Sequence, residues 1–253
     1  MVHFVGAGSG AVDLITVRGA EFLKKADVVI YAGSLVNPEV LKYCRSDSQI
    51  YNSAEMDLEE IINVIKSAED RGLNTVRLHT GDPSIYGAIK EQMVSLDESG
   101  IEYDTCPGVS ACFGAAASLD LEYTLPCVSQ TLIITRMQGR TEVPDTESIE
   151  SLASHKASMA IYLSAGMLDE LSRRLMDGGY TEDTPAALCY KATWPDEKNI
   201  ICTVGTLSET AKENNITKTA VVLVGDVIGE KQITRSKLYS PDFSTEFRDA
   251  KNN

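Results

Sequence analysis

Positions 75–87 read Thr-Val-Arg-Leu-His-Thr-Gly-Asp-Pro-Ser-Ile-Tyr-Gly, and this stretch decides the fold. Its β-branched and apolar start predicts a strand over Thr75–Leu78, and the glycine and proline residues after it predict a loop. A helix to about Glu98 is predicted next. In open α/β sheets, loops that follow a strand and precede a helix line the ligand crevice. The stretch therefore predicts a strand, a ligand loop and a helix of an α/β protein.

The same order occurs on both sides of this stretch. The segments 6–10 and 106–111 also contain glycine, and each follows a predicted strand. Helices begin after Thr16 and after Asp57, where Glu60 completes a capping box. The predicted strands of this half are Val2–Val5, Asp27–Ala32, Thr75–Leu78 and Ile101–Thr105. Alternation of strands and helices predicts a mainly parallel sheet over residues 1–120.

The second half repeats the alternation more loosely, which predicts a second α/β domain over residues 121–240 and a polar tail over 241–253. The predicted strands are Val128–Thr135, Met159–Ser164, Ala186–Tyr190, Ile200–Val204 and Ala220–Val224. The predicted helices are Ser148–Ser154, Met167–Met176 and Leu207–Asn214.

Composition excludes several classes of protein. The formal net charge of −14 over 253 residues argues against a nucleic-acid partner, because phosphate binding needs a basic face. No apolar run reaches the length of a membrane span, and the first residues lack the pattern of a signal peptide, so we expect a cytoplasmic protein. The six cysteines form no CxxC pair and the three histidines are far apart, so no metal site is expected.

The first glycine segment formally fits a dinucleotide fingerprint, with Gly6, Gly8 and Ala11 in the required spacing. That fingerprint needs an acidic residue at the end of the second strand to hold the ribose. The second strand instead runs into Ala32 and Gly33. A tight turn is the better interpretation, and an NAD site is not expected.

Two arginines follow the first strand of the second half. Val128–Thr135 leads directly to Arg136, and Arg140 follows in a glycine-containing loop. Arginine binds carboxylates and phosphates in a bidentate manner, so this pair indicates an anion site in an acidic chain. The alternative is a pair of surface arginines. No nucleophile with a paired base is apparent, so an enzyme of this sequence would align two substrates.

These motifs resemble those of the tetrapyrrole (corrin/porphyrin) methyltransferases, over nearly the whole chain. Three segments look like the first three family motifs: residues 5–10 with 13–16, residues 81–83 with 86–87, and residues 107–111. Thr219–Gly225 is similar to the closing strand of the family. Three further segments resemble sequences of one branch of the family, which methylates C11 of precorrin-4 or cobalt-precorrin-4 in cobalamin biosynthesis. These segments are 31–38, 129–144 and 190–197. The family opening usually has proline where this chain has Ser9.

The resemblance implies two α/β domains, with a mainly parallel N-terminal sheet, a mixed C-terminal sheet and the active site in the cleft between them. It implies S-adenosyl-L-methionine as cofactor, a tetrapyrrole substrate and a homodimer. The cofactor contacts that it carries over are Ser9, Thr80, Gly81, Asp82, Ile85, Ser110, Ala111, Leu163, Ala192, Thr219 and Ala220. Arg136, Arg140 and Lys191 are the candidates to hold the substrate carboxylates.

The catalytic base is not identified by the sequence. Asp82 and Tyr86 are candidates by position alone. Two alternatives stay open: another corrin-ring or uroporphyrinogen-III methyltransferase, and a non-catalytic nucleotide-binding module that uses the same glycine loops. Whether the ring carries cobalt when it is methylated also stays open.

Overall fold

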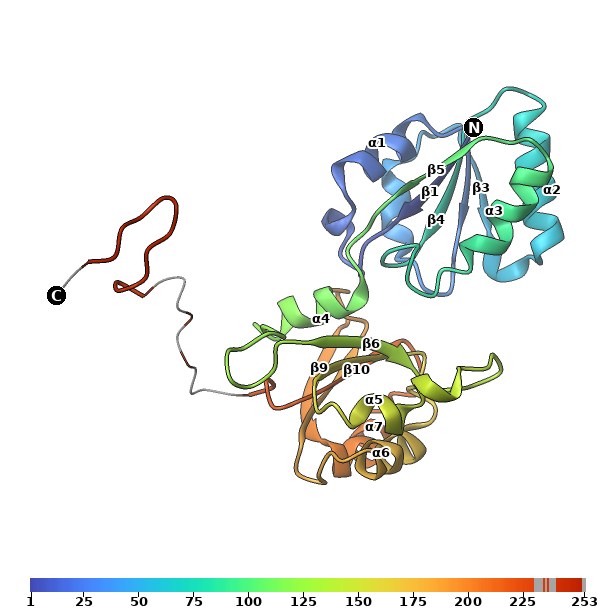
Figure 1. Cartoon of the computed structure of the whole chain (residues 1–253). Coiled ribbons are helices and arrows are strands. Elements are labelled where there is room, and N and C mark those ends of the chain that lie inside the picture. The colour runs from blue at the N-terminus through green and yellow to red at the C-terminus, as the bar shows by residue number, and fades with distance from the viewer. Residues whose placement is uncertain (230–233, 235, 237–239, 252–253) are drawn as a thin grey trace. The chain divides into compact units, whose positions relative to one another are not determined.

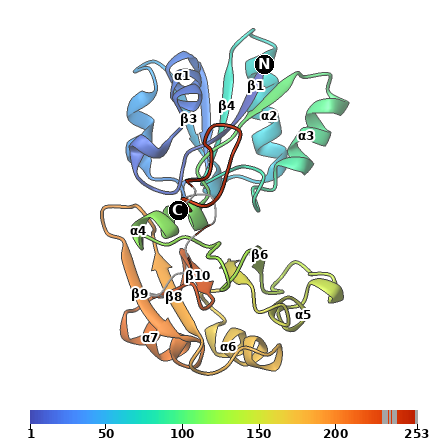
Figure 2. The ribbon, with the colours of Figure 1, turned by 60° about the vertical axis from the view of Figure 1, so that its left-hand side comes forward.

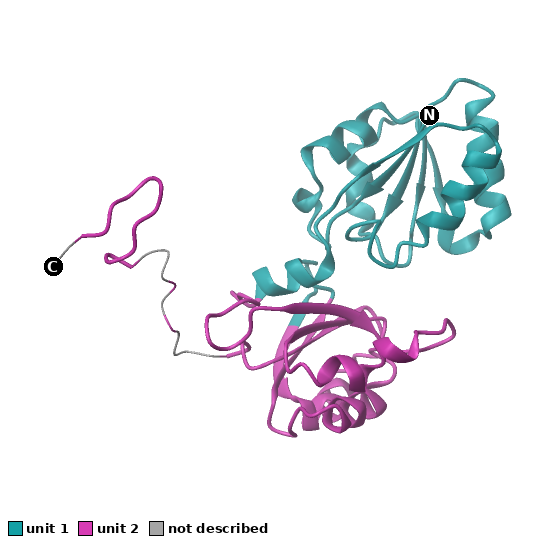
Figure 3. Cartoon of the chain, viewed as in Figure 1, with its two compact units in different colours: residues 1–118, 191–198 teal, residues 119–190, 199–253 magenta. Residues whose placement is uncertain are grey.

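The structure is a computed structural model that describes residues 1–229, 234, 236 and 240–251. The chain forms two compact units (Figure 3). Unit 1 comprises residues 1–118 and 191–198, and unit 2 comprises residues 119–190 and 199–253. The segment 191–198 thus lies with unit 1, although the residues on both sides of it lie with unit 2. The sequence predicts two continuous domains, over residues 1–120 and 121–240, and these bounds remain a prediction.

Unit 1 contains a five-stranded sheet in the order β3-β2-β4-β1-β5, and each strand is parallel to its neighbours (Figure 1). The strands are β1 (Val2–Gly6), β2 (Val28–Tyr31), β3 (Gln49–Asn52), β4 (Thr75–His79) and β5 (Tyr103–Cys106). Since all strands are parallel, their carboxyl ends meet at one edge. The loops that follow β1, β4 and β5 therefore start side by side.

Helices cover both faces of this sheet (Figure 2). The helices of unit 1 are α1 (Val17–Lys25), α2 (Leu58–Glu69), α3 (Ile89–Glu98) and α4 (Ala111–Ser118). α1 packs Leu23 against Val5 and Val29 on one face, whereas α2 packs Ile65 against Ile30 on the other. The alternation of side chains along each strand supplies apolar residues to both faces.

Local capping fixes where these helices begin, as predicted. The Thr16 hydroxyl accepts a hydrogen bond from the Gly19 amide at 3.1 Å. The Asp57 carboxylate accepts from the Glu60 amide at 2.8 Å, and the Glu60 carboxylate accepts from the Asp57 amide at 3.0 Å. This capping box satisfies two amide groups that a helix N-terminus leaves without partners.

Unit 2 contains a mixed five-stranded sheet in the order β6-β7-β10-β8-β9, as the resemblance implied. β6 is parallel to β7, and β10 is antiparallel to β7 and β8. Its strands are β6 (Leu132–Arg136), β7 (Ser158–Tyr162), β8 (Pro185–Tyr190), β9 (Lys198–Thr203) and β10 (Ala220–Val224). Its helices are α5 (Ile149–Ala153), α6 (Leu168–Asp177) and α7 (Leu207–Glu213), which bury Leu171 and Leu207 against the sheet.

Short 3-10 helices complete the elements: η1 (Val12–Leu14), η2 (Pro38–Tyr43), η3 (Ser53–Glu55), η4 (Asp145–Glu147) and η5 (Val204–Thr206). One strand was missed and one was predicted to begin too early. β3 was not predicted, and β6 begins at Leu132 rather than Val128. The amides of Val128 and Ser129 donate to the Leu125 carbonyl, so this part of the β-branched run forms a turn.

The described part of the predicted polar tail forms a small turn of its own. The Arg248 guanidinium donates to the carbonyls of Ser240 and Phe243 at 2.8 and 3.2 Å. Residues 252 and 253 of that predicted tail lie outside the described residues.

Candidate active site

Three glycine loops meet at the carboxyl edge of the first sheet. Gly6 lies opposite His79 in the register of β1 and β4, and Val5 lies opposite Cys106 in β5. Beyond the strands, the Gly8 amide donates to the Gly81 carbonyl at 3.3 Å and the Gly81 amide donates to the Gly8 carbonyl at 2.8 Å. The two loops are thus paired through their backbones.

The close approach of these loops requires glycine. A methyl group at Gly6 would lie 2.7 Å from the Gly108 Cα, and a methyl group at Gly108 would overlap the Gly81 carbonyl. Gly8 and Gly81 have φ of +85° and +59°, which disfavour a side chain. Backbone atoms rather than side chains therefore form this part of the sheet edge.

The Asp82 carboxylate ties the second loop to the third. One oxygen accepts from the Gly108 amide at 2.9 Å. The other accepts from the Ser84 amide at 2.9 Å and from the Ser84 hydroxyl at 2.5 Å. Burial raises the pKa of Asp82, but these hydrogen bonds from Ser84 and Gly108 outweigh it and hold the pKa below its ordinary value. Asp82 is consequently ionised at neutral pH and a weak proton acceptor.

Most predicted cofactor contacts of unit 1 lie at this edge. Thr80, Gly81, Asp82 and Ile85 follow β4, and Ser110 and Ala111 follow β5. Ser110 is buried, with 5% of its surface exposed, and Thr80, Ile85 and Ala111 are half-buried.

Ser9 and Ala192 are brought together by the segment 191–198. The Ser9 hydroxyl is buried and lies 2.9 Å from the Thr193 hydroxyl. Ala192 is buried, and its carbonyl oxygen would lie 2.8 Å from a methyl group at Gly10. Residues 191–198 therefore pack directly on the first glycine loop.

In unit 2, three further predicted contacts lie at one edge of the second sheet. Leu163 follows β7, Thr219 directly precedes β10, and Ala220 is the first residue of β10. Because β10 is antiparallel to β7, its start lies where β7 ends. Leu163 and Thr219 have φ of +54° and +57°. Left-handed backbone at non-glycine residues costs free energy and is concentrated at functional sites.

Comparisons with known proteins agree with this architecture. The family model described as Tetrapyrrole (Corrin/Porphyrin) Methylases matches residues 1–208. The chain belongs to this family. It is 50% identical over 247 residues to a cobalt-precorrin-4 C(11)-methyltransferase of Methanocaldococcus jannaschii, covering 98% of this chain and 95% of that protein.

Two further relatives extend the match. A precorrin-4 C(11)-methyltransferase of Pseudomonas aeruginosa is 43% identical, with 94% of each chain covered. A solved structure of a cobalt precorrin-4 methyltransferase superposes with a TM-score of 0.88 at 41% identity, covering 90% of this chain and 96% of the other.

The candidate substrate residues of this tetrapyrrole methylase differ in their surroundings. The Arg136 guanidinium donates to the carbonyls of Met137, Thr141 and Glu142 at 3.0–3.3 Å, so it stabilises its own loop. Arg140 in that loop is exposed. The Lys191 ammonium donates to Asp196 at 2.7 Å and lies 5.0 Å from the centre of the Trp194 ring.

Other features of the methylase were not found from its sequence. Arg77 and His79 are buried on β4, where Arg77 donates to Gln92 and to the Ile30 carbonyl, both at 3.1 Å. Burial, together with the charge of Arg77, lowers the pKa of His79 to about 3. Their i, i+2 spacing on a strand places them on one face, but nothing in the sequence marked that face as polar. Tyr86, the second candidate base, is 44% exposed and has a φ of +56°.

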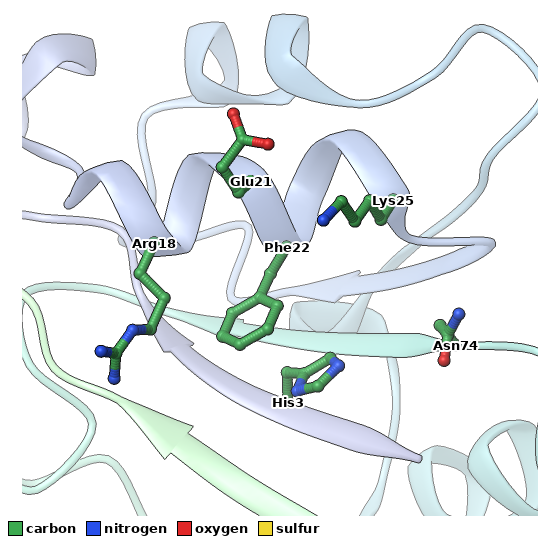
Figure 4. A pocket seen from close by; sticks show the side chains of 6 residues that line it. All are labelled: His3, Arg18, Glu21, Phe22, Lys25 and Asn74. Carbon is green, nitrogen blue, oxygen red and sulfur yellow. The ribbon is translucent and has the colours of Figure 1, made fainter.

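Figure 4 shows a surface pocket of unit 1. It is lined by His3, Arg18, Glu21, Phe22, Lys25 and Asn74. The His3 and Phe22 rings stack with centroids 3.9 Å apart, and His3 lies 2.7 Å from an Asp104 carboxylate oxygen. The pocket contains none of the predicted site residues.

Within the described part of the chain, no group of three or more His, Cys, Asp or Glu side chains is arranged to hold a metal ion. No described helix is long and apolar enough to cross a membrane.

Proposed function

We propose that this chain transfers a methyl group from S-adenosyl-L-methionine to C11 of cobalt-precorrin-4 or precorrin-4 in cobalamin biosynthesis. The observation that carries the proposal is the 50% identity, over 98% of the chain, to a protein named for that reaction. The meeting of three glycine loops at the carboxyl edge of a parallel sheet supports it, because ligands bind at this edge in α/β proteins.

The unit 1 residues fit a cofactor that is held mainly by backbone groups. The edge offers the left-handed Gly81, the small side chains of Ser110 and Ala111, and the ionised Asp82. We infer that Thr80, Gly81, Ile85, Ser110, Ala111 and Ala192 contact the cofactor there. Leu163, Thr219 and Ala220 are proposed as contacts from unit 2. When bound, S-adenosyl-L-methionine supplies a methyl group on a positively charged sulfur, and its transfer leaves a neutral thioether and one proton to be lost.

Asp82 is proposed to act through its charge and not as the base. Its oxygens already accept from three donors, and its pKa lies below the ordinary value. A carboxylate that stays ionised favours a nearby cation, and the sulfonium of the cofactor is one. The same three hydrogen bonds hold the second and third loops in place for the ligand.

Recognition of the substrate needs positive charge, because the chain is acidic and the tetrapyrrole carries many carboxylates. We propose Arg140 as a direct contact, since its side chain is exposed. Arg136 orders the loop that carries Arg140 through its hydrogen bonds to three carbonyls. Lys191 keeps its ammonium beside Asp196 and is proposed as a third cation near the substrate.

A radiochemical assay tests the proposal against its two alternatives. The protein is incubated with methyl-labelled S-adenosyl-L-methionine and, in parallel, with cobalt-precorrin-4, precorrin-4 and uroporphyrinogen III. Label in either precorrin-4 form supports the proposal, and the ratio of the two rates assigns the metal state of the substrate. Label in uroporphyrinogen III alone supports the other methyltransferase activity. Cofactor binding without transfer to any tetrapyrrole supports a non-catalytic module.

We further propose that the protein is cytoplasmic, as expected from its sequence, and that it forms the homodimer that the resemblance implies. Light scattering over a wide concentration range tests the assembly. A mass of twice 27.5 kDa is expected, and a single chain at every concentration would contradict it.

A further inference from the structure

The segment 191–198 fills the space beside the first glycine loop. A methyl group at Gly10 would overlap the indole ring of Trp194, so the loop backbone and this ring are in direct contact. A methyl group at Gly114 in α4 would overlap the Ser9 side chain and lie 3.2 Å from Thr193 Cγ2. Glycine at both positions lets the segment pack closely. Figure 3 draws the segment in the colour of unit 1.

The Thr193 hydroxyl is the polar centre of this contact. It accepts a hydrogen bond from the Ala11 amide at 3.0 Å and lies 2.9 Å from the Ser9 hydroxyl. Ala11 ends the first glycine loop, and its amide is bound by a side chain 182 positions away. The Thr193 hydroxyl therefore fixes both the backbone and the side chain of this loop.

The conformation of Thr193 is strained and is held from several sides. Its φ is +66°, which a β-branched residue rarely adopts. Its amide donates to the Glu197 carboxylate at 2.6 Å, and the same carboxylate oxygen accepts from the Ser118 hydroxyl at 2.9 Å. Strain of this kind persists where the surroundings over-determine it, and it is concentrated at functional sites.

We propose that residues 191–198 are a latch on the first glycine loop and that Thr193 is a positioning residue for cofactor binding. The inference rests on the proposed function, since the loop is the first of the three proposed to surround the cofactor. The latch acts through the Ala11 amide and Ser9, which keep the 8–11 backbone in the conformation paired with Gly81. Ser9 is thereby assigned to the latch rather than to direct contact with the cofactor.

Four variants test the latch. Thr193→Val keeps the shape and the β-branching, so the backbone strain is unchanged and the hydroxyl is lost. Thr193→Ser keeps the hydroxyl. Ser9→Ala removes the partner hydroxyl. Thr203→Val is the matched control, because Thr203 pairs its hydroxyl with Thr206 at 3.3 Å in unit 2, whereas the first glycine loop belongs to unit 1.

Three quantities are measured for each variant: the affinity for S-adenosylhomocysteine by calorimetry, amide exchange at Gly10 and Ala11, and the free energy of unfolding. We expect Thr193→Val to weaken binding at least tenfold and to speed exchange at Ala11. Ser9→Ala should cause a smaller loss, because the Ala11 amide keeps its hydrogen bond to the Thr193 hydroxyl. Thr193→Ser should restore affinity to within about threefold of the wild type. Thr203→Val should lower stability without changing affinity.

The outcomes separate the latch from the proposed function. Undiminished affinity in Thr193→Val overturns the latch while the proposed function stands. Equal losses in Thr193→Val and Thr203→Val also overturn it, because general destabilisation then explains both. A wild-type protein that does not bind S-adenosylhomocysteine overturns the proposed function and the latch with it.

Discussion

At the scale of single residues, Asp82 connects structure and proposed chemistry. Its carboxylate accepts from Gly108 in one loop and from Ser84 in another, so one side chain holds two glycine loops together. Hydrogen bonds to an ionised group are stronger than neutral ones, which is also why the pKa of Asp82 is lowered. A single substitution here affects loop geometry and local charge at once.

Asp82→Asn is expected to lower the free energy of unfolding by about 1–2 kcal/mol, because charged acceptors contribute more than neutral ones. The pKa of Asp82 is lower in the folded protein than in the unfolded chain, where it is near 3.8. The contribution of the ionised carboxylate to the free energy of unfolding is therefore fully present above pH 3.8, and it is lost as the pH falls through the pKa of the folded protein. Urea titrations of both proteins from pH 7 to pH 3 measure this. A difference that stays constant down to pH 3 would contradict the assigned charge.

Arg140→Ala is expected to weaken tetrapyrrole binding at least tenfold, about 1.4 kcal/mol, and to leave S-adenosylhomocysteine affinity unchanged. Arg140→Lys should retain part of the affinity, since it keeps the charge but loses the bidentate geometry. Arg136→Ala is a less direct test, because it also releases the carbonyls of Thr141 and Glu142. Fluorescence titration with the tetrapyrrole measures all three. If Arg140→Ala binds the tetrapyrrole normally, Arg140 is a surface residue that does not contact the substrate.

At the scale of elements, β4 leads into the second glycine loop and also carries a buried polar face. Arg77 is 5% exposed, and desolvation lowers its pKa to about 10. It donates to Gln92, whose amide donates in turn to the Ala88 carbonyl just before α3. This chain of hydrogen bonds connects the strand to the end of the second glycine loop.

The lowered pKa of the buried His79 predicts how the free energy of unfolding depends on pH. Its pKa is lowered from 6.5 to about 3, so the unfolded chain binds a proton that the folded protein does not bind between these values. The contribution of His79 to the free energy of unfolding is therefore fully present above pH 6.5. It falls by up to about 1.4 kcal/mol per pH unit as the pH drops toward 3. We expect His79→Gln to flatten this slope between pH 6.5 and 4 in urea titrations. An unchanged slope would show that other groups cause the acid sensitivity.

The helix α2 offers a test of local stability without a change in function. Asp57→Ala removes the side-chain acceptor of the capping box and should lower the free energy of unfolding by about 1 kcal/mol. Methyl transfer should be unchanged, since α2 contains none of the proposed site residues. If the Asp57→Ala variant is folded but has lost activity, this would contradict the placement of the site.

Elements with strong local patterns could be predicted from the sequence, and the others could not. The capping of α1 and α2 and the three glycine loops follow from short motifs, and the structure contains them. β3 was missed because Gln49 and Ile50 are exposed on an edge strand, without the apolar alternation that marks a strand. The contact of Thr193 with Ala11 was missed because no local pattern relates positions so far apart. The roles of Arg136 and Asp82 depend on partners that only the fold supplies.

At the scale of the whole molecule, two sheets of different type carry the candidate residues at their edges. The parallel sheet of unit 1 places Gly8, Gly81 and Gly108 together, and the mixed sheet of unit 2 places Leu163 and Thr219 together. The cleft between two domains that the resemblance implies stays a prediction. Because the net charge is −14, we expect an anionic substrate to need local cations such as Arg140.

The most direct measurement is the position of the methyl group in the product. The purified protein is incubated with cobalt-precorrin-4 or precorrin-4 and S-adenosyl-L-methionine carrying an isotopically labelled methyl group, and the product is examined by mass spectrometry and NMR. We predict one labelled methyl group, bonded to C11, together with S-adenosylhomocysteine. A labelled methyl group at another ring carbon, or no transfer to either precorrin-4 form, would contradict the proposed function.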